Sequence, residues 1–276
     1  MFPILPIIGI SLNETQDIIL TLASATPIFL VFNIPTLIFI TIYFACREKM
    51  RLRNELDKMN IQSDAIVSNQ CNRNEIVEFQ YKGQRVKYLN FMERGVGLNR
   101  NNALMRADAE LSIIADDDMI FVDGYVDIVK KHFRENPDVD VIIFNLLERN
   151  SSRYVIKKKF RVRYWNFMRF GAARLVFKTR SITKHGLFFN LHFGGGAEYS
   201  AGEDTLFLYD CLKHGLKIIA VPDAIAILTN DRGSSWFEGY TDKYFYDKGV
   251  LFAAMSKRWS KLNNSKPLRA VLRTFD

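Results

Sequence analysis

Three consecutive carboxylates, Asp116, Asp117 and Asp118, follow the apolar run 111–115, which has the length of a buried strand. Alternate side chains of an extended strand share a face, so we expect Asp116 and Asp118 to point to one spot and Asp117 to point away. Two carboxylates held close together repel each other unless a cation lies between them. The pattern predicts a Mg²⁺ site on Asp116 and Asp118. An acidic loop with helix-capping duties is the alternative.

A loop with two glycines precedes this triplet. Gly95 and Gly97 let the backbone turn tightly, and a helix-compatible run then continues to about residue 107. Backbone amides at the start of a helix favour an anion, and a guanidinium matches phosphate oxygens. Gly95, Gly97, Arg100 and Asn101 are therefore predicted to meet a phosphate. The alternative is that Arg100 and Asn101 form a solvated first helical turn.

A second pair of carboxylates, Glu203 and Asp204, follows the glycine-rich loop 193–202 and begins an apolar-periodic helix, 205–212. Glycines in this loop allow a bulky ligand to approach the backbone. Carboxylates in a first helical turn are also stabilised by the helix dipole, so capping is the plainer explanation. These residues alone are compatible with either a ligand-binding site or a helix cap.

Strands and helices alternate along the middle of the chain. Apolar runs predict strands at 64–69, 139–146 and 216–221, a hairpin joins 75–80 to 85–90, and 126–135 has a helical pattern. This alternation predicts an α/β fold with a largely parallel sheet, whose ligands bind beyond the carboxyl ends of the strands. Asn69, at the end of the first of these strands, is a polar candidate for binding such a ligand.

The acidic triplet, the Gly-x-Gly…Arg-Asn loop and Gly202-Glu203-Asp204 together resemble the family 2 glycosyltransferases with the GT-A fold. The resemblance covers residues 61–249 and implies a GT-A-like mixed, mainly parallel sheet flanked by helices. It also implies transfer, with inversion, of a sugar from a nucleotide-sugar donor to a glycan or lipid-linked glycan in surface polysaccharide biosynthesis. Manganese or magnesium is the implied cofactor.

The resemblance also implies roles for individual residues. Asp204 would be the base that deprotonates the acceptor hydroxyl, and Glu203 would bind the acceptor or orient the loop. The family often supplies a late metal or diphosphate ligand, commonly histidine, where this chain has 229–236 without a histidine, so Asp231 is the candidate there. The implied metal ligands are Asp116, Asp118 and Asp231, and the implied donor-binding residues are Asn69, Gly95, Gly97, Arg100, Asn101, Asp116 and Asp117.

Composition limits the partners. A net charge of +8 and a pI near 9.3 favour an anionic partner, which could be nucleic acid, anionic lipid or a phosphorylated substrate. The basic and aromatic stretch 157–165 has a composition found on nucleic-acid surfaces and on anionic membranes, and a solvated basic face is the commoner explanation. The resemblance, whose acceptors are often sugars on a lipid diphosphate, implies a membrane surface or lipid phosphate, and no RNA-recognition signature supports nucleic acid. Cys46, Cys71 and Cys211 have no Cys-x-x-Cys spacing, which argues against disulfides and structural zinc and favours a reducing compartment.

The first sixty residues differ from the rest. Residues 18–45 carry no charge, a length that can cross a bilayer, and a basic flank begins at Arg47. The positive-inside rule then predicts an anchor, with the large domain at the cytoplasmic face of the membrane. Two short buried elements broken at Pro27 and Pro35 are the alternative. We divide the chain into an atypical hydrophobic segment, 1–60, and a GT-A-like domain, 61–276.

Enzymes of the resembling family normally begin with a strand whose polar end helps hold the nucleotide base. The sequence before Ile61 shows no convincing copy, and Ile8–Asn13 is only a weak candidate. Two alternatives to a glycosyltransferase are considered. One is a non-catalytic remnant that lacks the nucleotide strand, and the other is a nucleotidyltransferase, which would release pyrophosphate.

Overall fold

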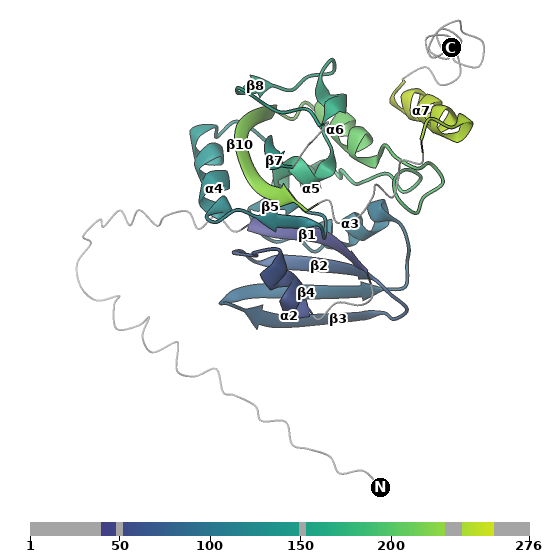
Figure 1. The fold of residues 1–276 in the computed structure, drawn as a ribbon. Helices are drawn as coiled ribbons and strands as arrows, with labels where there is room; N and C mark the ends of the chain where they lie inside the picture. The colour runs from purple at the N-terminus through teal and green to yellow at the C-terminus, as the bar shows by residue number, and fades with distance from the viewer. Residues whose placement is uncertain (1–39, 48–51, 149–152, 230–238, 257–276) are drawn as a thin grey trace, which may run out of the picture. The chain divides into compact units, whose positions relative to one another are not determined.

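The computed structural model describes residues 40–47, 52–148, 153–229 and 239–256. These residues form one ten-stranded sheet in the order β3-β4-β2-β1-β5-β9-β7-β10-β6, with β8 paired to β10 (Figure 1). The strands are β1 (Ile40–Arg47), β2 (Ala65–Gln70), β3 (Glu75–Tyr81), β4 (Gln84–Phe91), β5 (Leu111–Ile114), β6 (Met119–Phe121), β7 (Val141–Leu147), β8 (Phe160–Arg161), β9 (Leu175–Lys178) and β10 (Ile218–Leu228). The helices are α2 (Leu52–Lys58), α3 (Val96–Leu104), α4 (Tyr125–Glu135), α5 (Thr179–Lys184), α6 (Glu203–Lys213) and α7 (Asp242–Met255), with the 3₁₀ turns η1 (Phe167–Arg169) and η2 (Ala172–Arg174).

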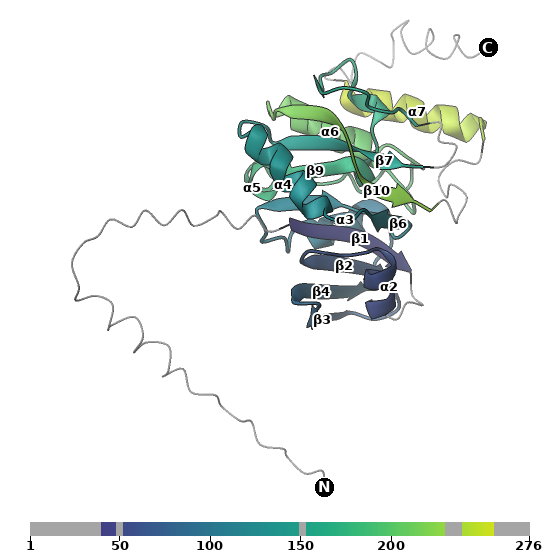
Figure 2. The same cartoon turned by 60° about the vertical axis from the view of Figure 1, so that its left-hand side comes forward.

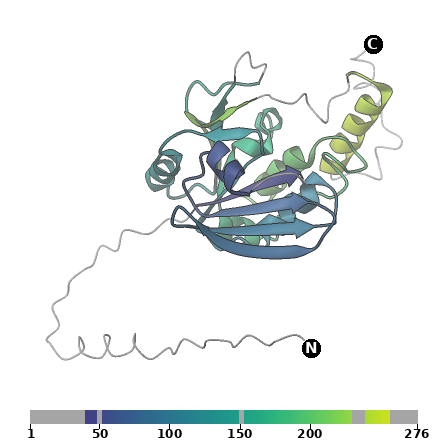
Figure 3. The same cartoon turned by 60° about the horizontal axis from the view of Figure 1, so that its bottom comes forward.

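Most strands of the sheet run in one direction. Strands β4, β2, β1 and β5 are parallel neighbours, and Figure 3 shows the N-terminal strands side by side in purple and blue. Strand β9 is antiparallel to both β5 and β7, so β7 runs with β5, and β10 is parallel to β7. The predicted mixed, mainly parallel α/β sheet is confirmed.

Helices cover both faces of the sheet. Tyr125, Val129 and Phe133 of α4 recur every four residues and are buried, so one stripe of this helix packs on the sheet together with Leu56 of α2. The other face is covered by apolar side chains of α3, α5 and α6, and Figure 2 shows α4 and α6 on opposite sides.

Strand β1 corrects the predicted start of the domain. Ile42 of β1 pairs with Ala65 of β2, and Ile40 pairs with Leu111 of β5, so β1 lies inside the sheet. The domain therefore begins before Ile61, and the first strand that the sequence did not reveal is present. A strand between two parallel neighbours reads as a continuous apolar run, which is why its residues merged with the uncharged stretch 18–45.

The rest of the predicted anchor, residues 18–39, and the weak candidate strand 8–13 lie outside the described residues. In the part of the chain that the structure describes, no helix has the length and apolar character needed to cross a bilayer.

The other predicted elements are confirmed with small shifts, except for β10. This strand was expected to stop before Pro222 and instead continues to Leu228, with shifts of register against β7 between Ala220 and Ala226. Such an irregularity accommodates a proline, which has no amide hydrogen to donate to the ladder. Cys71 and Cys211 are buried free thiols, in agreement with the prediction that they form no disulfide.

Candidate active site

The carboxylate triplet lies in a tight turn at the carboxyl end of β5. The amide of Met119 donates to the carbonyl of Asp116 over 3.3 Å, so the chain reverses between β5 and β6. The strand ends at Ile114, so strand alternation does not set the directions of the Asp116 and Asp118 side chains. The three carboxylates are instead brought together by the turn.

Asp118 has an oxygen that is suited to a cation. Its backbone carbonyl accepts hydrogen bonds from the amide and hydroxyl of Thr229, at 3.0 and 3.2 Å, which fix the turn against the end of β10. Its side-chain Oδ1 is buried and has no hydrogen-bond partner among the described residues. Burial, followed by the charges of Asp116 and Asp117, raises the pKa of Asp118. A bound divalent cation would satisfy this oxygen and offset the repulsion.

The described residues do not contain a preformed metal site of three or more His, Cys, Asp or Glu side chains. Asp231, the predicted third ligand, lies outside the described residues. The oxygens available here are the carboxylates of the turn, a hard donor set of the kind that Mg²⁺ and Mn²⁺ take together with substrate phosphates.

Arg100 joins the two carboxylate clusters. Its Nη2 donates to Asp116 Oδ1 over 2.9 Å, and its Nη1 donates to Glu203 Oε1 over 3.1 Å. The guanidinium is 7% exposed and lies 5.3 Å from the ring centroid of Phe189. The predicted phosphate-binding fork is thus occupied by two carboxylates from distant parts of the sequence. This ion-pair bridge links Asp116 of the turn to Glu203 at the start of α6.

The glycine loop before α3 is held by backbone contacts. The amide of Gly95 donates to Gln70 Oε1, and the amide of Val96 donates to the carbonyl of Gly195 over 2.9 Å. The Val96 amide, one of the first amides of α3, is therefore already paired within the protein. Gly97 lies close to the carbonyl of Asn190, and a Cβ added at this position would be 2.8 Å from that oxygen.

We expect Gly97→Ala to lower the free energy of unfolding by about 1–3 kcal/mol, because the new methyl group overlaps a backbone carbonyl that cannot swing away. Gly195→Ala is the matched control, since nothing lies within 4 Å of the added carbon there. Urea unfolding of the two variants measures the difference. Equal stability of both variants would contradict the close approach of α3 to the 190–196 loop.

The two asparagines of the predicted donor site serve the scaffold in this structure. Asn101 exchanges two 2.8 Å hydrogen bonds with the backbone of Phe189, which anchors the acceptor-side loop to α3. Asn69, buried at the end of β2, donates to Asn90 Oδ1 over 2.8 Å, and its own Oδ1 has no partner among the described residues. Asn69 therefore keeps one acceptor for a ligand, whereas Asn101 uses both of its groups.

Glu203 and Asp204 begin α6 next to the ion-pair bridge. Glu203 Oε1 contacts Arg100, and its Oε2 accepts from the amide of Gly202. Asp204 Oδ1 accepts from the amide of Thr205 over 2.7 Å, while its Oδ2 faces Gly171, whose missing Cβ would lie 3.3 Å away. Burial, with the charge of Glu203, raises the pKa of Asp204 to about 6, against the lowering effect of Arg100. A carboxylate with this pKa is suited to general-base chemistry near neutral pH.

Helix α7 supports the loop that precedes these carboxylates. The buried carboxylate of Asp247 accepts from the amide and hydroxyl of Ser200, at 2.9 and 2.7 Å, and from Lys243. Gly202, with φ of +123°, leaves space for Leu251. Only glycine readily adopts this backbone conformation. The 200–202 turn is thus fixed by α7 just before Glu203.

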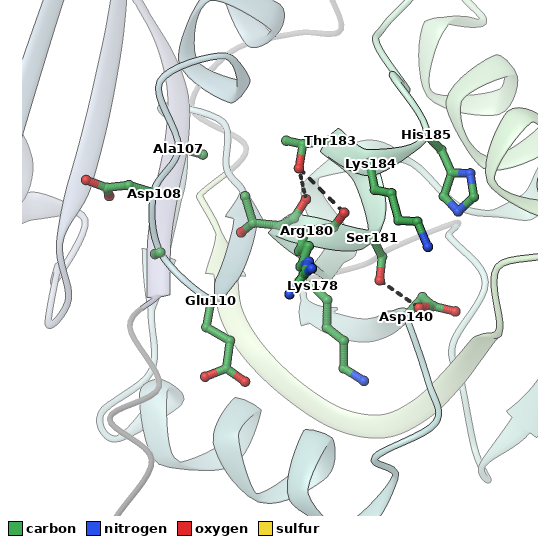
Figure 4. Close-up of a pocket in the computed structure, with 12 residues that line it drawn as sticks. Ala107, Asp108, Glu110, Asp140, Lys178, Arg180, Ser181, Thr183, Lys184 and His185 are labelled. Atoms are coloured by element: carbon green, nitrogen blue, oxygen red, sulfur yellow. Dashed lines mark hydrogen bonds between the residues drawn. The ribbon is translucent and has the colours of Figure 1, made fainter.

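A polar pocket of about 840 Å³ lies elsewhere, beside α5 (Figure 4). Glu110, which precedes β5, and Lys178, which ends the antiparallel β9, line it, so it opens at the amino end of β5, opposite to the carboxylate turn. Figure 4 shows Arg180, Lys184 and His185 around it, and a hydrogen bond from Ser181 to Asp140. None of the predicted site residues lines this pocket.

Comparisons with known proteins agree with this geometry. Residues 65–193 match the sequence model of Glycosyl transferase family 2. No curated protein matches the sequence at a significant level.

Solved structures share the fold at low sequence identity. Residues 1–349 of S. aureus TarS, in complex with UDP-GlcNAc, give a TM-score of 0.59 at 16% identity, covering 79% of this chain and 66% of that chain. A longer S. aureus TarS structure gives 0.57 at 14% identity, over 83% of this chain and 40% of that chain. The mannosyltransferase PcManGT from Pyrobaculum calidifontis, in complex with GDP-Man and Mn²⁺, gives 0.50 at 13% identity, over 82% and 65%. This chain spans less than two thirds of each of these structures, and the likeness confirms the predicted GT-A-like fold.

Proposed function

We propose that this chain, which over residues 65–193 belongs to Glycosyl transferase family 2, transfers a sugar from a nucleotide-sugar donor to a hydroxyl of a glycan or lipid-linked glycan, with inversion. The observation that carries the proposal is the ion-pair bridge. Arg100 contacts Asp116 and Glu203 at once, so a donor-side carboxylate and an acceptor-side carboxylate face one site. The alternative of a non-catalytic remnant depended on a missing first strand, and β1 is present in the sheet between β2 and β5.

On this proposal Asp204 accepts the proton of the acceptor hydroxyl through Oδ2, the oxygen on the side of Gly171. The hydroxyl oxygen forms a bond to the anomeric carbon as the bond from that carbon to the diphosphate breaks, and a nucleoside diphosphate leaves. A single displacement of this kind inverts the anomeric centre. Hydrogen bonding from Thr205 to Oδ1 fixes the rotation of the carboxylate, so that Oδ2 stays available.

Asp118, with Asp116 beside it, would hold a Mn²⁺ or Mg²⁺ ion, and the fit rests on the buried, unpartnered Oδ1 of Asp118. When bound, such an ion offsets the charge that develops on the departing diphosphate. Arg100, held between Asp116 and Glu203, keeps positive charge beside the same region. Asp231 stays a proposed further ligand.

Calorimetric titration with UDP and with GDP, each with and without Mn²⁺, tests the donor site. We expect nucleotide binding that depends on the metal and is lost in Asp118→Ala, because that change removes the unpartnered oxygen. Asp138→Ala is the control, since this exposed carboxylate forms only a surface ion pair with Lys217, 3.4 Å away. Binding that is unchanged in Asp118→Ala would overturn the assignment, and absence of binding to any nucleotide would overturn the function.

The pH dependence of transfer follows from the raised pKa of Asp204. Its carboxylate form is the base, so we expect kcat/KM to fall about tenfold for each pH unit below about 6, where Asp204 becomes protonated. Because the charge of Glu203 contributes to the raised pKa, Glu203→Gln is expected to move this acidic limb to lower pH. If the acidic limb of kcat/KM keeps the same pH in Glu203→Gln, the group that ionises there is not Asp204.

The acceptor and the cellular place belong to the same proposal. A glycan or lipid-linked glycan in surface polysaccharide biosynthesis is the proposed acceptor, and the cytoplasmic face of the membrane is the proposed location, with no nucleic acid as partner. The positive charge of the chain supports an anionic surface as a partner. A transfer assay with lipid-linked and soluble glycan acceptors would distinguish the two acceptor classes.

A further inference from the structure

Exposed side chains between residues 157 and 169 combine two chemistries, and we call them the 157–169 surface. Six of them are cationic and three are apolar or aromatic. They are Lys157, Lys158, Lys159, Arg161, Arg163 and Arg169, together with Tyr164, Trp165 and Met168. Strand β8, near the upper edge of Figure 1, lies within this segment.

The positive charge of this surface is not neutralised locally. From residue 149 to residue 197 the sequence contains no aspartate or glutamate. Within the described part of the chain, none of the six cations forms an ion pair with a carboxylate, whereas other exposed cations, such as Lys82 and Arg85, do. A concentrated positive surface whose cations form no ion pair with a carboxylate among the described residues favours an anionic partner.

The apolar members have the character of a lipid interface. Trp165 is 74% exposed, and the guanidinium of Arg163 lies 5.4 Å from the centroid of its ring. Tyr164 is also more than half exposed, and Met168 lies open beside them. Amphipathic aromatic rings and long basic side chains gather where hydrocarbon meets phosphate headgroups, because each side chain has an apolar body and a polar end.

This surface is held rigidly and lies close to the site. The buried ring of Phe167 and the ring of Tyr164 both contact Tyr209 of α6, whose hydroxyl donates to the carbonyl of Met255 over 2.6 Å. The same segment continues directly to Gly171, which faces Asp204 Oδ2. A membrane bound here would lie next to the carboxylate that the proposed reaction uses.

We propose that the 157–169 surface docks on a membrane that contains anionic lipids. Its lysines and arginines bind headgroup phosphates, and Tyr164, Trp165 and Met168 enter the interface. The consequence for catalysis, delivery of a lipid-borne acceptor to Asp204, rests on the proposed function. Membrane binding itself does not, and its test uses neither donor nor acceptor, so the two can fail separately.

Co-sedimentation of the full chain with vesicles tests the proposal, with phosphatidylcholine alone or with phosphatidylglycerol added. We expect binding to rise when anionic lipid is present, and this gain to be lost by roughly 25-fold in the partition coefficient for Arg163→Gln/Arg169→Gln, since each basic side chain contributes about fivefold. Arg180→Gln/Lys184→Gln removes the same charge from the pocket of Figure 4 and serves as the control. Equal losses in the two double variants would overturn the assignment to this surface.

Tryptophan fluorescence gives a second readout that is independent of the N-terminal segment. Of the three tryptophans, Trp236→Phe/Trp259→Phe leaves only Trp165. We expect brominated lipid to quench its emission when the protein binds vesicles. Vesicle-bound protein with unquenched Trp165 would overturn the proposal, as would binding to soluble polyglutamate without any binding to vesicles, which would indicate an acidic macromolecule instead.

Discussion

Asp204→Asn is expected to lower the rate of sugar transfer by about 10²- to 10⁴-fold, because the amide cannot accept the proton of the acceptor hydroxyl. Metal-dependent nucleotide binding should stay nearly intact, since the Asp204 carboxylate accepts from Thr205 and faces Gly171, and the proposal places it at the acceptor. Transfer is measured as release of nucleoside diphosphate, and binding by calorimetry.

Asp210→Asn is the matched control for this variant. Asp210 lies on the same helix, α6, and burial raises the pKa of its carboxyl too, so both changes neutralise a carboxylate of one helix. Only the Asp204 variant is expected to lose transfer. Loss of nucleotide binding together with transfer in Asp204→Asn would show that this residue maintains the donor site, which would contradict its assignment as the base.

Local patterns predicted the elements well, because each pattern reports burial within one segment. Two examples are the hairpin of β3 and β4, with Gly83 in its turn, and the helix from Tyr125 to Glu135. In both, the periodic spacing of apolar residues is visible in the sequence. The same reasoning failed for β1. A strand buried between two parallel neighbours has no alternation, and its apolar residues continue the uncharged run that precedes it.

The residue types at the site could also be predicted, but their contacts could not. The sequence indicated Arg100 as a phosphate ligand because an arginine in a first helical turn suits an anion. Its observed partners, Asp116 and Glu203, come from a turn after β5 and from the start of α6, and only the packing of α3 against the sheet brings them together. The pairing of Val96 with Gly195 depends on the same long-range packing.

The support from α7 illustrates a further limit. Ser200, Lys243 and Asp247 are ordinary polar residues in sequence, and nothing in their spacing links a loop near residue 200 to a helix more than forty residues later. Glycine at 202 gave the only signal, since its positive φ is required where Leu251 packs. A glycine next to a functional carboxylate can therefore indicate a packing partner as well as a ligand.

Arg100→Gln is expected to destabilise the fold by about 3–5 kcal/mol, because it leaves Glu203, which is largely buried, and Asp116 without their common cation. Urea unfolding measures this effect. Arg106→Gln on the same segment is the control, since Arg106 donates to the carbonyl of Asn102 and forms no ion pair with any carboxylate that the structure describes. Equal stability of the two variants would contradict a structural role for the bridge.

The double variant Arg100→Gln/Glu203→Gln separates charge from packing. If the cost of Arg100→Gln comes from an uncompensated carboxylate, removing the charge of Glu203 should restore part of the lost stability. The pH profile of transfer by Arg100→Gln gives a second test. Arg100 lowers the pKa of Asp204, so its removal should move the acidic limb of the pH profile upward, in the direction opposite to Glu203→Gln. Opposite shifts in the two variants would show that one ion-pair bridge sets both the stability of the site and the ionisation of its base.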